Sequence, residues 1–97
     1  MKLSKQNINA ISSYLADKPV VKAYLFGSQV RGEAASDSDI DILVELDYTQ
    51  KIGLGFVRMQ VELEELLGKK VDLVSSKGIS KYIKPIIDRE KQLIYSR

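Results

Sequence analysis

Residues 25–46, LFGSQVRGEAASDSDIDILVEL, contain the pattern that decides the fold of this chain. An apolar run is followed at once by Gly27 and Ser28, and ten residues later a second strand pattern begins with Asp39 and Asp41. Side chains alternate along a strand, so both carboxylates point to one face, with Cα atoms about 7 Å apart. Like charges side by side repel, and burying either one is costly. The pair therefore indicates a ligand site, unless both aspartates are solvated turn residues at the start of the strand.

The patterns on either side of this stretch predict one α/β (α+β) domain spanning residues 1–97, a length that suits a single domain. Apolar and polar residues alternate as in strands over residues 20–26, 39–46, 69–76 and 92–96. Helical spacing occurs over residues 5–16, 56–67 and 79–89, the last interrupted at Pro85. The order α-β-(loop)-β-α-β-α-β predicts a small mixed sheet with helices packed on it.

The helix over residues 56–67 carries an apolar stripe that we expect to face the core. Its members are Phe56, Met59, Leu63, Leu66 and Leu67. Gly68 follows directly and is the expected C-cap.

Composition restricts the chemistry that this chain can perform. It contains no cysteine and no histidine, so disulfides and thiolate or imidazole metal sites are excluded. Any metal must be a hard cation held by oxygen, and Mg²⁺ or Mn²⁺ fits best. No apolar run approaches the roughly 20 residues that span a bilayer, and the N-terminus lacks the apolar region of a signal peptide. No membrane association is expected, and the cytoplasm is the expected location.

Charge is unevenly distributed along the chain. The net charge of +2 is too small to indicate nucleic-acid binding by itself. Residues 77–97 nevertheless hold six basic and two acidic side chains. This segment is either a solvated, lysine-rich helix face or a contact for phosphates or an acidic partner.

A third carboxylate supports the interpretation of the aspartate pair as a metal site. Asp72 lies between Val71 and Leu73 in an apolar strand pattern, where a charge has little structural use. If this strand is adjacent to residues 39–46, Asp72 lies beside Asp39 and Asp41. Three carboxylates around two metal ions are the arrangement that in-line phosphoryl transfer requires.

The loop after the first strand has features of a phosphate site. Gly27 allows a ligand to approach the backbone closely, and successive N–H groups can bind an anion beside the Ser28 hydroxyl. Arg31 continues the loop, and its guanidinium suits phosphate oxygens. The loop lacks the G-K-[ST] sequence of a Walker A motif.

The spacing G-S-x10-D-x-D, formed by Gly27, Ser28, Asp39 and Asp41, resembles the signature of the DNA polymerase β-type nucleotidyltransferase superfamily. The string GSQVRGEAASDSDIDILV is similar to its minimal nucleotidyltransferase branch, the MNT or MntA-like proteins. The chain length, the strand aspartate and the ending IKPIIDREKQLIYS agree with that branch, so the resemblance covers nearly the whole chain.

The resemblance implies a nucleotidyltransferase fold and a set of site residues. Asp39, Asp41 and Asp72 would hold two Mg²⁺ ions, with Mn²⁺ as a substitute. Gly27 and Ser28 would hold the phosphates of ATP or another nucleoside triphosphate, assisted by Arg31. Asp72 would be the third catalytic carboxylate and would help coordinate the metal that activates the acceptor hydroxyl.

The resemblance also implies a partner and an activity. Family members act as antitoxins paired with a HEPN-domain toxin, and they are similar to enzymes that transfer AMP from ATP to a HEPN tyrosine. An alternative is a non-catalytic antitoxin that neutralises its partner by occlusion. A third option is an antibiotic-modifying nucleotidyltransferase, against which the lack of an acceptor-binding domain counts. The same lack argues against template-directed polymerisation, so nucleic acid is not expected as a template.

Overall fold

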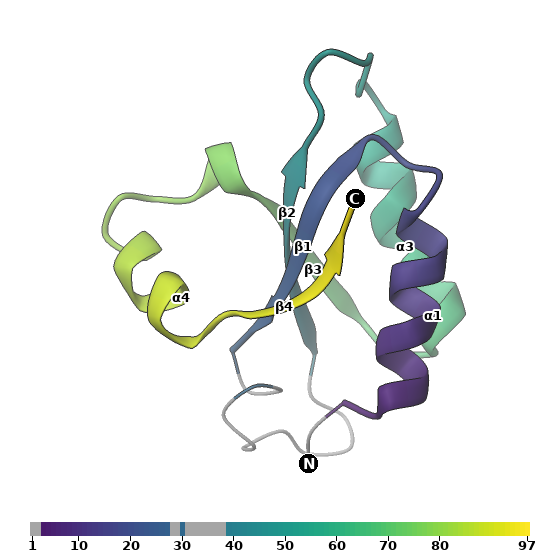
Figure 1. Ribbon diagram of the computed structural model, residues 1–97, viewed down its shortest axis with the longest axis horizontal. Coiled ribbons are helices and arrows are strands. Elements are labelled where there is room, and N and C mark those ends of the chain that lie inside the picture. The colour runs from purple at the N-terminus through teal and green to yellow at the C-terminus, as the bar shows by residue number, and fades with distance from the viewer. Residues whose placement is uncertain (1–2, 28–29, 31–38) are drawn as a thin grey trace.

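A four-stranded mixed sheet forms the centre of the protein, and helices cover both of its faces (Figure 1). The computed structural model describes residues 3–27, 30 and 39–97. The strands lie in the order β3-β2-β1-β4, with β1 antiparallel to β2 and β4, and β2 parallel to β3. Their bounds are Val20–Phe26 for β1, Ile40–Leu46 for β2, Val71–Ser75 for β3 and Gln92–Ser96 for β4. The predicted element order and mixed sheet are confirmed.

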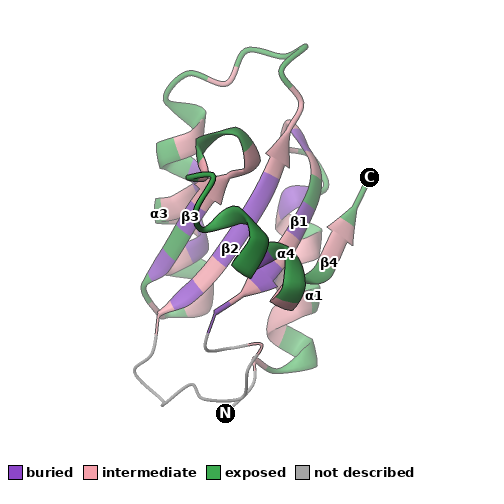
Figure 2. Ribbon diagram, turned by 90° about the vertical axis from the view of Figure 1, so that its left-hand side faces the viewer, coloured by how far each residue is buried: buried purple, intermediate pink, exposed green. Residues whose placement is uncertain are grey.

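Helices α1 (Lys5–Leu15) and α3 (Gly55–Leu67) cover one face of the sheet (Figure 1). Ser4 caps α1 because its side-chain oxygen accepts a hydrogen bond from the Asn7 backbone N–H at 3.1 Å. The core lies between these helices and the sheet, and its burial is visible as purple segments in Figure 2. Its most completely buried side chains are Ile11, Leu15, Val20, Ile40, Ile42, Val44, Leu63 and Val71.

The predicted apolar stripe of α3 is only partly in the core. Met59 and Leu63 are buried, and Phe56 and Leu67 pack against the core from its edge. The prediction for Leu66 is wrong, since its side chain is 48% exposed. A helix turns about 100° per residue, so Leu66 lies about 60° around the helix from Leu63. Leu63 faces the sheet, and Leu66 therefore lies outside the buried side of the helix. The predicted C-cap at Gly68 is confirmed by its left-handed backbone, with φ of 66°.

The opposite face of the sheet is covered by α4 (Lys84–Glu90), which follows the short 3₁₀ helix η1 (Ser76–Gly78) (Figures 1 and 2). The prediction of a helix from residue 79 is wrong, because residues 79–83 form irregular structure and turns. Pro85 lies in the first turn of α4, where a missing N–H leaves no helical hydrogen bond unmade. The proline therefore starts this helix instead of interrupting it. Ile87 is buried and anchors α4 on the protein.

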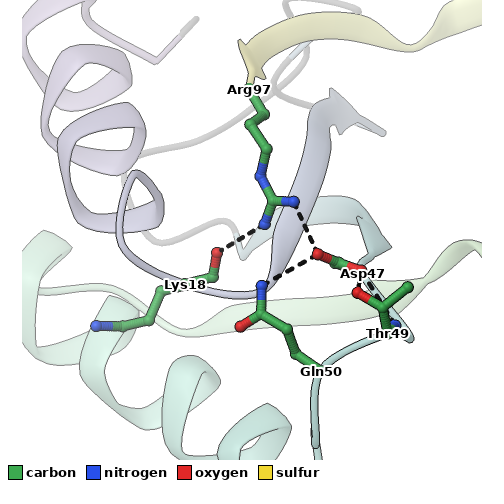
Figure 3. A network of polar contacts seen from close by, with 5 residues as sticks. All are labelled: Lys18, Asp47, Thr49, Gln50 and Arg97. Atoms are coloured by element: carbon green, nitrogen blue, oxygen red, sulfur yellow. Dashed lines mark hydrogen bonds and ion pairs between the residues drawn. The ribbon is translucent and has the colours of Figure 1, made fainter.

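Arg97 forms hydrogen bonds at the end of the sheet that lies away from the aspartate pair. Arg97 donates hydrogen bonds to Asp47 Oδ2 at 2.8 Å and to the Lys18 carbonyl at 3.4 Å (Figure 3). Asp47 also accepts hydrogen bonds from Thr49 and Gln50. The hydrogen bond from Arg97 is the largest cause that holds the pKa of Asp47 well below its usual range. The network thus joins β4 to the connections before β1 and after β2.

No helix among residues 3–27, 30 and 39–97 is both long enough and apolar enough to cross a membrane.

Candidate active site

Two of the predicted carboxylates are neighbours across adjacent strands. Asp41 on β2 pairs in register with Asp72 on β3, as the sequence predicted for the third strand. Residues paired in this way project from the same face of a sheet, and adjacent strands lie about 4.8 Å apart. Asp41 is half-buried and Asp72 is exposed. The sheet therefore places two negative charges side by side on its α4 face, at an accessible position.

The same row continues onto β1. Phe26, the last residue of β1, pairs in register with Asp41. Gly27 is the next residue along the chain, so the turn after β1 lies directly beside the carboxylates. This register follows from the alternation of apolar residues, because Ile40, Ile42 and Val44 must face the core.

Asp39 is half-buried and lies one residue before β2. Within the described part of the chain, no three acidic side chains are grouped closely enough to hold a metal ion. The structure therefore brings Asp41 and Asp72 together, and the role of Asp39 as a third ligand stays a prediction. Two carboxylates from adjacent strands, in a chain without histidine or cysteine, are a donor set that suits a hard cation such as Mg²⁺.

Gly27 occupies a position that other residues could not adopt without strain. It is buried, and its φ of 78° lies in the left-handed region. A Cβ atom here would overlap Asp41 Oδ2 and lie 3.2 Å from Asp41 Cγ. The glycine therefore permits both the turn and the close approach of the Asp41 carboxylate. Ser28 and Arg31, the other predicted phosphate ligands, lie outside the described residues.

The Gly27 amide has a partner that the sequence analysis missed. Its N–H donates a hydrogen bond to Glu90 Oε1 at 2.9 Å. Glu90 is the last residue of α4, and the anchoring of that helix by Ile87 brings its carboxylate to the turn after β1. No motif marks Glu90, because it belongs to a charged helix end, DREK, of ordinary composition. Only the packing of α4 on the sheet shows the contact.

A cavity of about 360 Å³ opens beside the carboxylate pair. The aspartates contribute to its lining, and most of its other walls are apolar side chains from β1, β3 and the segment from η1 to α4. The complete lining is Phe26, Asp41, Asp72, Val74, Gly78, Ile79, Ser80, Ile83 and Ile87. A second cavity, of about 310 Å³, lies between the start of β1 and α3 and shares no lining residue with the first. The cavity beside the carboxylates is therefore the candidate substrate site.

Comparison with protein families agrees with this geometry. The family described as "Nucleotidyltransferase domain" matches residues 8–94. A Methanocaldococcus jannaschii protein, provisionally named a protein adenylyltransferase, is 40% identical over 94 residues, which cover 94% of this chain and 92% of the relative. Both matches include the carboxylate pair and the turn after β1.

Two solved structures have the same fold. One, described as a toxin–antitoxin with AMP-PNP, has a TM-score of 0.80 and 27% identity, covering 94% of this chain and 74% of that chain. The other is the tri-AMPylated HEPN toxin of Shewanella oneidensis in complex with its MNT antitoxin. It has a TM-score of 0.74 and 25% identity, covering 98% of this chain and 74% of that chain.

Proposed function

Since this chain belongs to the nucleotidyltransferase family, in its minimal nucleotidyltransferase branch, we propose that it is a Mg²⁺-dependent antitoxin that transfers AMP from ATP to a hydroxyl of a HEPN-domain toxin. The observation that carries the proposal is the pairing of Asp41 with Asp72 beside the Gly27 turn. A carboxylate pair next to a turn that admits close approach suits a metal-bound triphosphate. The resemblance to a complex that contains an AMPylated HEPN toxin supports the choice of a protein acceptor.

Asp41 and Asp72 would hold the metal, together with Asp39. Mg²⁺, when bound, supplies positive charge that offsets the phosphate charges and favours deprotonation of the acceptor hydroxyl. Without a cation, the two adjacent carboxylates repel each other and an approaching triphosphate. A bound cation would remove this repulsion, as expected for a ligand site.

Gly27 and Ser28 would position the β- and γ-phosphates, with Arg31 as a further cation. The transfer forms one P–O bond between the acceptor oxygen and the α-phosphorus, and it breaks the bond that joins the α-phosphorus to pyrophosphate. The acceptor proton passes to solvent, to which the Asp72 carboxylate is exposed. Because the chain contains no histidine, no imidazole of this chain can act as the general base.

The proposed activity is tested by intact-mass spectrometry of the partner. The protein is incubated with Mg²⁺, ATP and a candidate HEPN-domain partner. Each transfer should add about 329 Da, the mass of AMP less water, to the partner. The Asp41→Asn/Asp72→Asn double variant should leave the partner's mass unchanged while the partner still binds.

The alternative antitoxin mechanism is occlusion without catalysis, and the same experiment separates the two. Exposed apolar side chains on and before α4, namely Tyr82, Ile83 and Ile86, offer a surface that a partner could cover. If the wild-type protein silences the partner with no increase in mass in the presence of ATP, GTP, CTP or UTP, occlusion is the mechanism and the proposal is wrong.

A further inference from the structure

We propose that the cavity between the start of β1 and α3 is a second binding site, which takes a small phosphate monoester that carries an aromatic body. The inference concerns a site separate from the carboxylate pair and does not depend on the proposed AMP transfer. The cavity has a volume of about 310 Å³. Pockets for small molecules begin at about 300 Å³, so this one suits a ligand with a single ring and one anionic group.

This cavity lies at the opposite end of the sheet from the carboxylate pair. Pro19 lines it, and the Pro19 carbonyl accepts a hydrogen bond from the Asp47 backbone N–H at 2.8 Å. Asp47 directly follows β2, whereas Asp41 is the second residue of that strand. Six positions of extended chain separate the two aspartates by about 20 Å. Ligand contacts in this cavity are therefore distinct from contacts at the carboxylate pair.

Positive charge gathers on the lining of the cavity. Lys18 comes from the connection before β1, Lys51 from the connection after β2, and Arg58 from α3. Glu62 is the acidic residue of the lining, so three positive charges and one negative charge leave a net charge of +2. A phosphate monoester carries about −1.5 to −2 charges near pH 7. It balances this excess better than a carboxylate or a phosphodiester, each with a single negative charge.

Two of the three cations have no side-chain partner that a ligand must displace. Lys51 and Arg58 are exposed, and neither side chain forms an ion pair or hydrogen bond among residues 3–27, 30 and 39–97. Lys18 pairs with Asp17 at 2.9 Å, but that carboxylate is 80% exposed, and such a surface pair contributes little. The planar guanidinium of Arg58 suits two parallel hydrogen bonds to phosphate oxygens.

Tyr14 holds two of the charged lining residues in place. Lys18 Nζ lies 4.6 Å from the centre of the Tyr14 ring, and the Tyr14 hydroxyl donates a hydrogen bond to Glu62 Oε1. Figure 3 shows the Lys18 side chain directed away from the network of Arg97 and Asp47. The ammonium group is thus fixed at the cavity, and the hydrogen bond to Glu62 partly offsets the negative charge that an incoming anion would meet.

The apolar part of the lining accounts for the body of the ligand. Pro19, Ile52 and Met59 line the cavity, and Met59 is only 3% exposed, so its side chain forms the deep part of the wall. A methionine sulfur makes favourable contacts with an aromatic ring. A cavity of about 150 Å³ can hold benzene, so about 310 Å³ accommodates one ring together with a phosphate group. Inorganic phosphate would leave these apolar side chains in contact with water.

The location of the site is tested by NMR on protein with labelled isoleucine and methionine methyl groups. The protein is titrated with phenyl phosphate in the absence of Mg²⁺ and ATP. Signals of Ile52 and Met59 should shift, whereas signals of Ile83 and Ile87, at the cavity beside the carboxylates, should not. The reverse pattern, or no shift at millimolar phenyl phosphate, would overturn the inference.

The identity of the ligand is tested by titration with AMP in the same way. Tighter binding of AMP than of phenyl phosphate, with shifts at Ile52 and Met59, would support the site and identify a nucleotide as its ligand. Similar affinities would support the site and identify the phosphate and one ring as the recognised groups. Methyl phenyl phosphate, a diester with a single charge, should bind at least about fivefold more weakly than phenyl phosphate, and equal binding of the two would overturn the inference.

Two exposed lysines provide a matched pair of variants, because Lys51 lines the cavity and Lys70 does not. Lys51→Gln should raise the Kd for phenyl phosphate at least about threefold, and Arg58→Gln at least about tenfold, since each removes a charge-assisted hydrogen bond. Lys70→Gln should leave this Kd within about twofold. Equal Kd values in the two lysine variants would overturn the inference. The Asp41→Asn/Asp72→Asn double variant should bind phenyl phosphate as the wild type does, and a loss of binding there would show that the carboxylate site was being measured.

Discussion

Substitution of Gly27 by alanine separates two effects that the structure places at one residue, backbone strain and contact with Asp41. An alanine at φ of 78° costs about 1–2 kcal/mol because its Cβ atom crowds the carbonyl oxygen. The same Cβ atom overlaps Asp41 Oδ2, so that side chain must rotate from its position, at a further cost of about 0.5–1.5 kcal/mol. We expect a total loss of stability of about 1.5–3.5 kcal/mol.

The matched control is Gly68→Ala. Gly68 has φ of 66°, similar to that of Gly27, but an added Cβ atom there meets nothing within 4 Å. This variant should lose only the strain energy, and each kcal/mol corresponds to about 4–8 °C in Tm for a domain of this size. Thermal and urea unfolding of both variants measure the difference. Combining Gly27→Ala with Asp41→Ala should reduce the excess loss, because the overlapping carboxylate is then absent.

The effect on the ligand should be larger than the effect on stability. Rotation of the Asp41 carboxylate removes one metal ligand from its position beside Asp72, and the added methyl group blocks close approach to the turn. Gly27→Ala should therefore lose detectable MgATP binding in isothermal titration while it remains folded, whereas Gly68→Ala should bind normally. If Gly27→Ala is no less stable than Gly68→Ala and still binds MgATP, the assigned role of the Gly27 turn is refuted.

Three further predictions concern single carboxylates. Glu90→Ala removes the acceptor of the Gly27 amide and should weaken ATP binding about tenfold. Glu90→Gln keeps an oxygen acceptor, so its Kd for ATP should stay within about threefold of the wild-type value. Tighter ATP binding by Glu90→Ala would contradict this role and show that the carboxylate competes with the triphosphate. Asp41→Asn should raise the Tm of the metal-free protein, and MgATP should then raise the Tm by less than it does in the wild type. A lower Tm in the metal-free variant, together with the full wild-type increase on adding MgATP, would contradict the metal site. The pKa of Asp47 is held below its usual value, so its contribution to stability is complete above about pH 4 and disappears as the pH falls through the lowered pKa. The Tm difference between wild type and Asp47→Asn should therefore be constant from pH 8 to about pH 5 and shrink at lower pH, and a difference that does not depend on pH would remove Asp47 from this role.

The sequence pattern predicted the helices and strands of this fold because burial in the core requires apolar residues at regular positions of each element. Ile40, Ile42 and Val44 alternate with the aspartates, so the face that carries Asp41 follows from the burial of the other face. The adjacency of β3 and β2 was only a condition of the sequence argument for Asp72, and the structure supplies it by pairing Asp41 with Asp72. The start of α4 could not be predicted in this way. Proline is tolerated in the first turn of a helix and disrupts its interior, so Pro85 was compatible with either a helix start or an interruption. Periodicity alone does not tell these positions apart.

Glu90 shows why part of the site was beyond prediction. Its hydrogen bond to the Gly27 amide joins residues that are 63 positions apart, and no local rule selects a partner at that separation. The contact exists because Ile87 anchors α4 on the sheet face, which places the C-terminal end of that helix beside the turn after β1. A buried backbone N–H needs an acceptor, and Glu90 supplies it for Gly27. Glu90 therefore belongs to the candidate functional site because it holds the backbone of Gly27, and the helix that carries it also contributes Ile87 to the cavity beside the carboxylates.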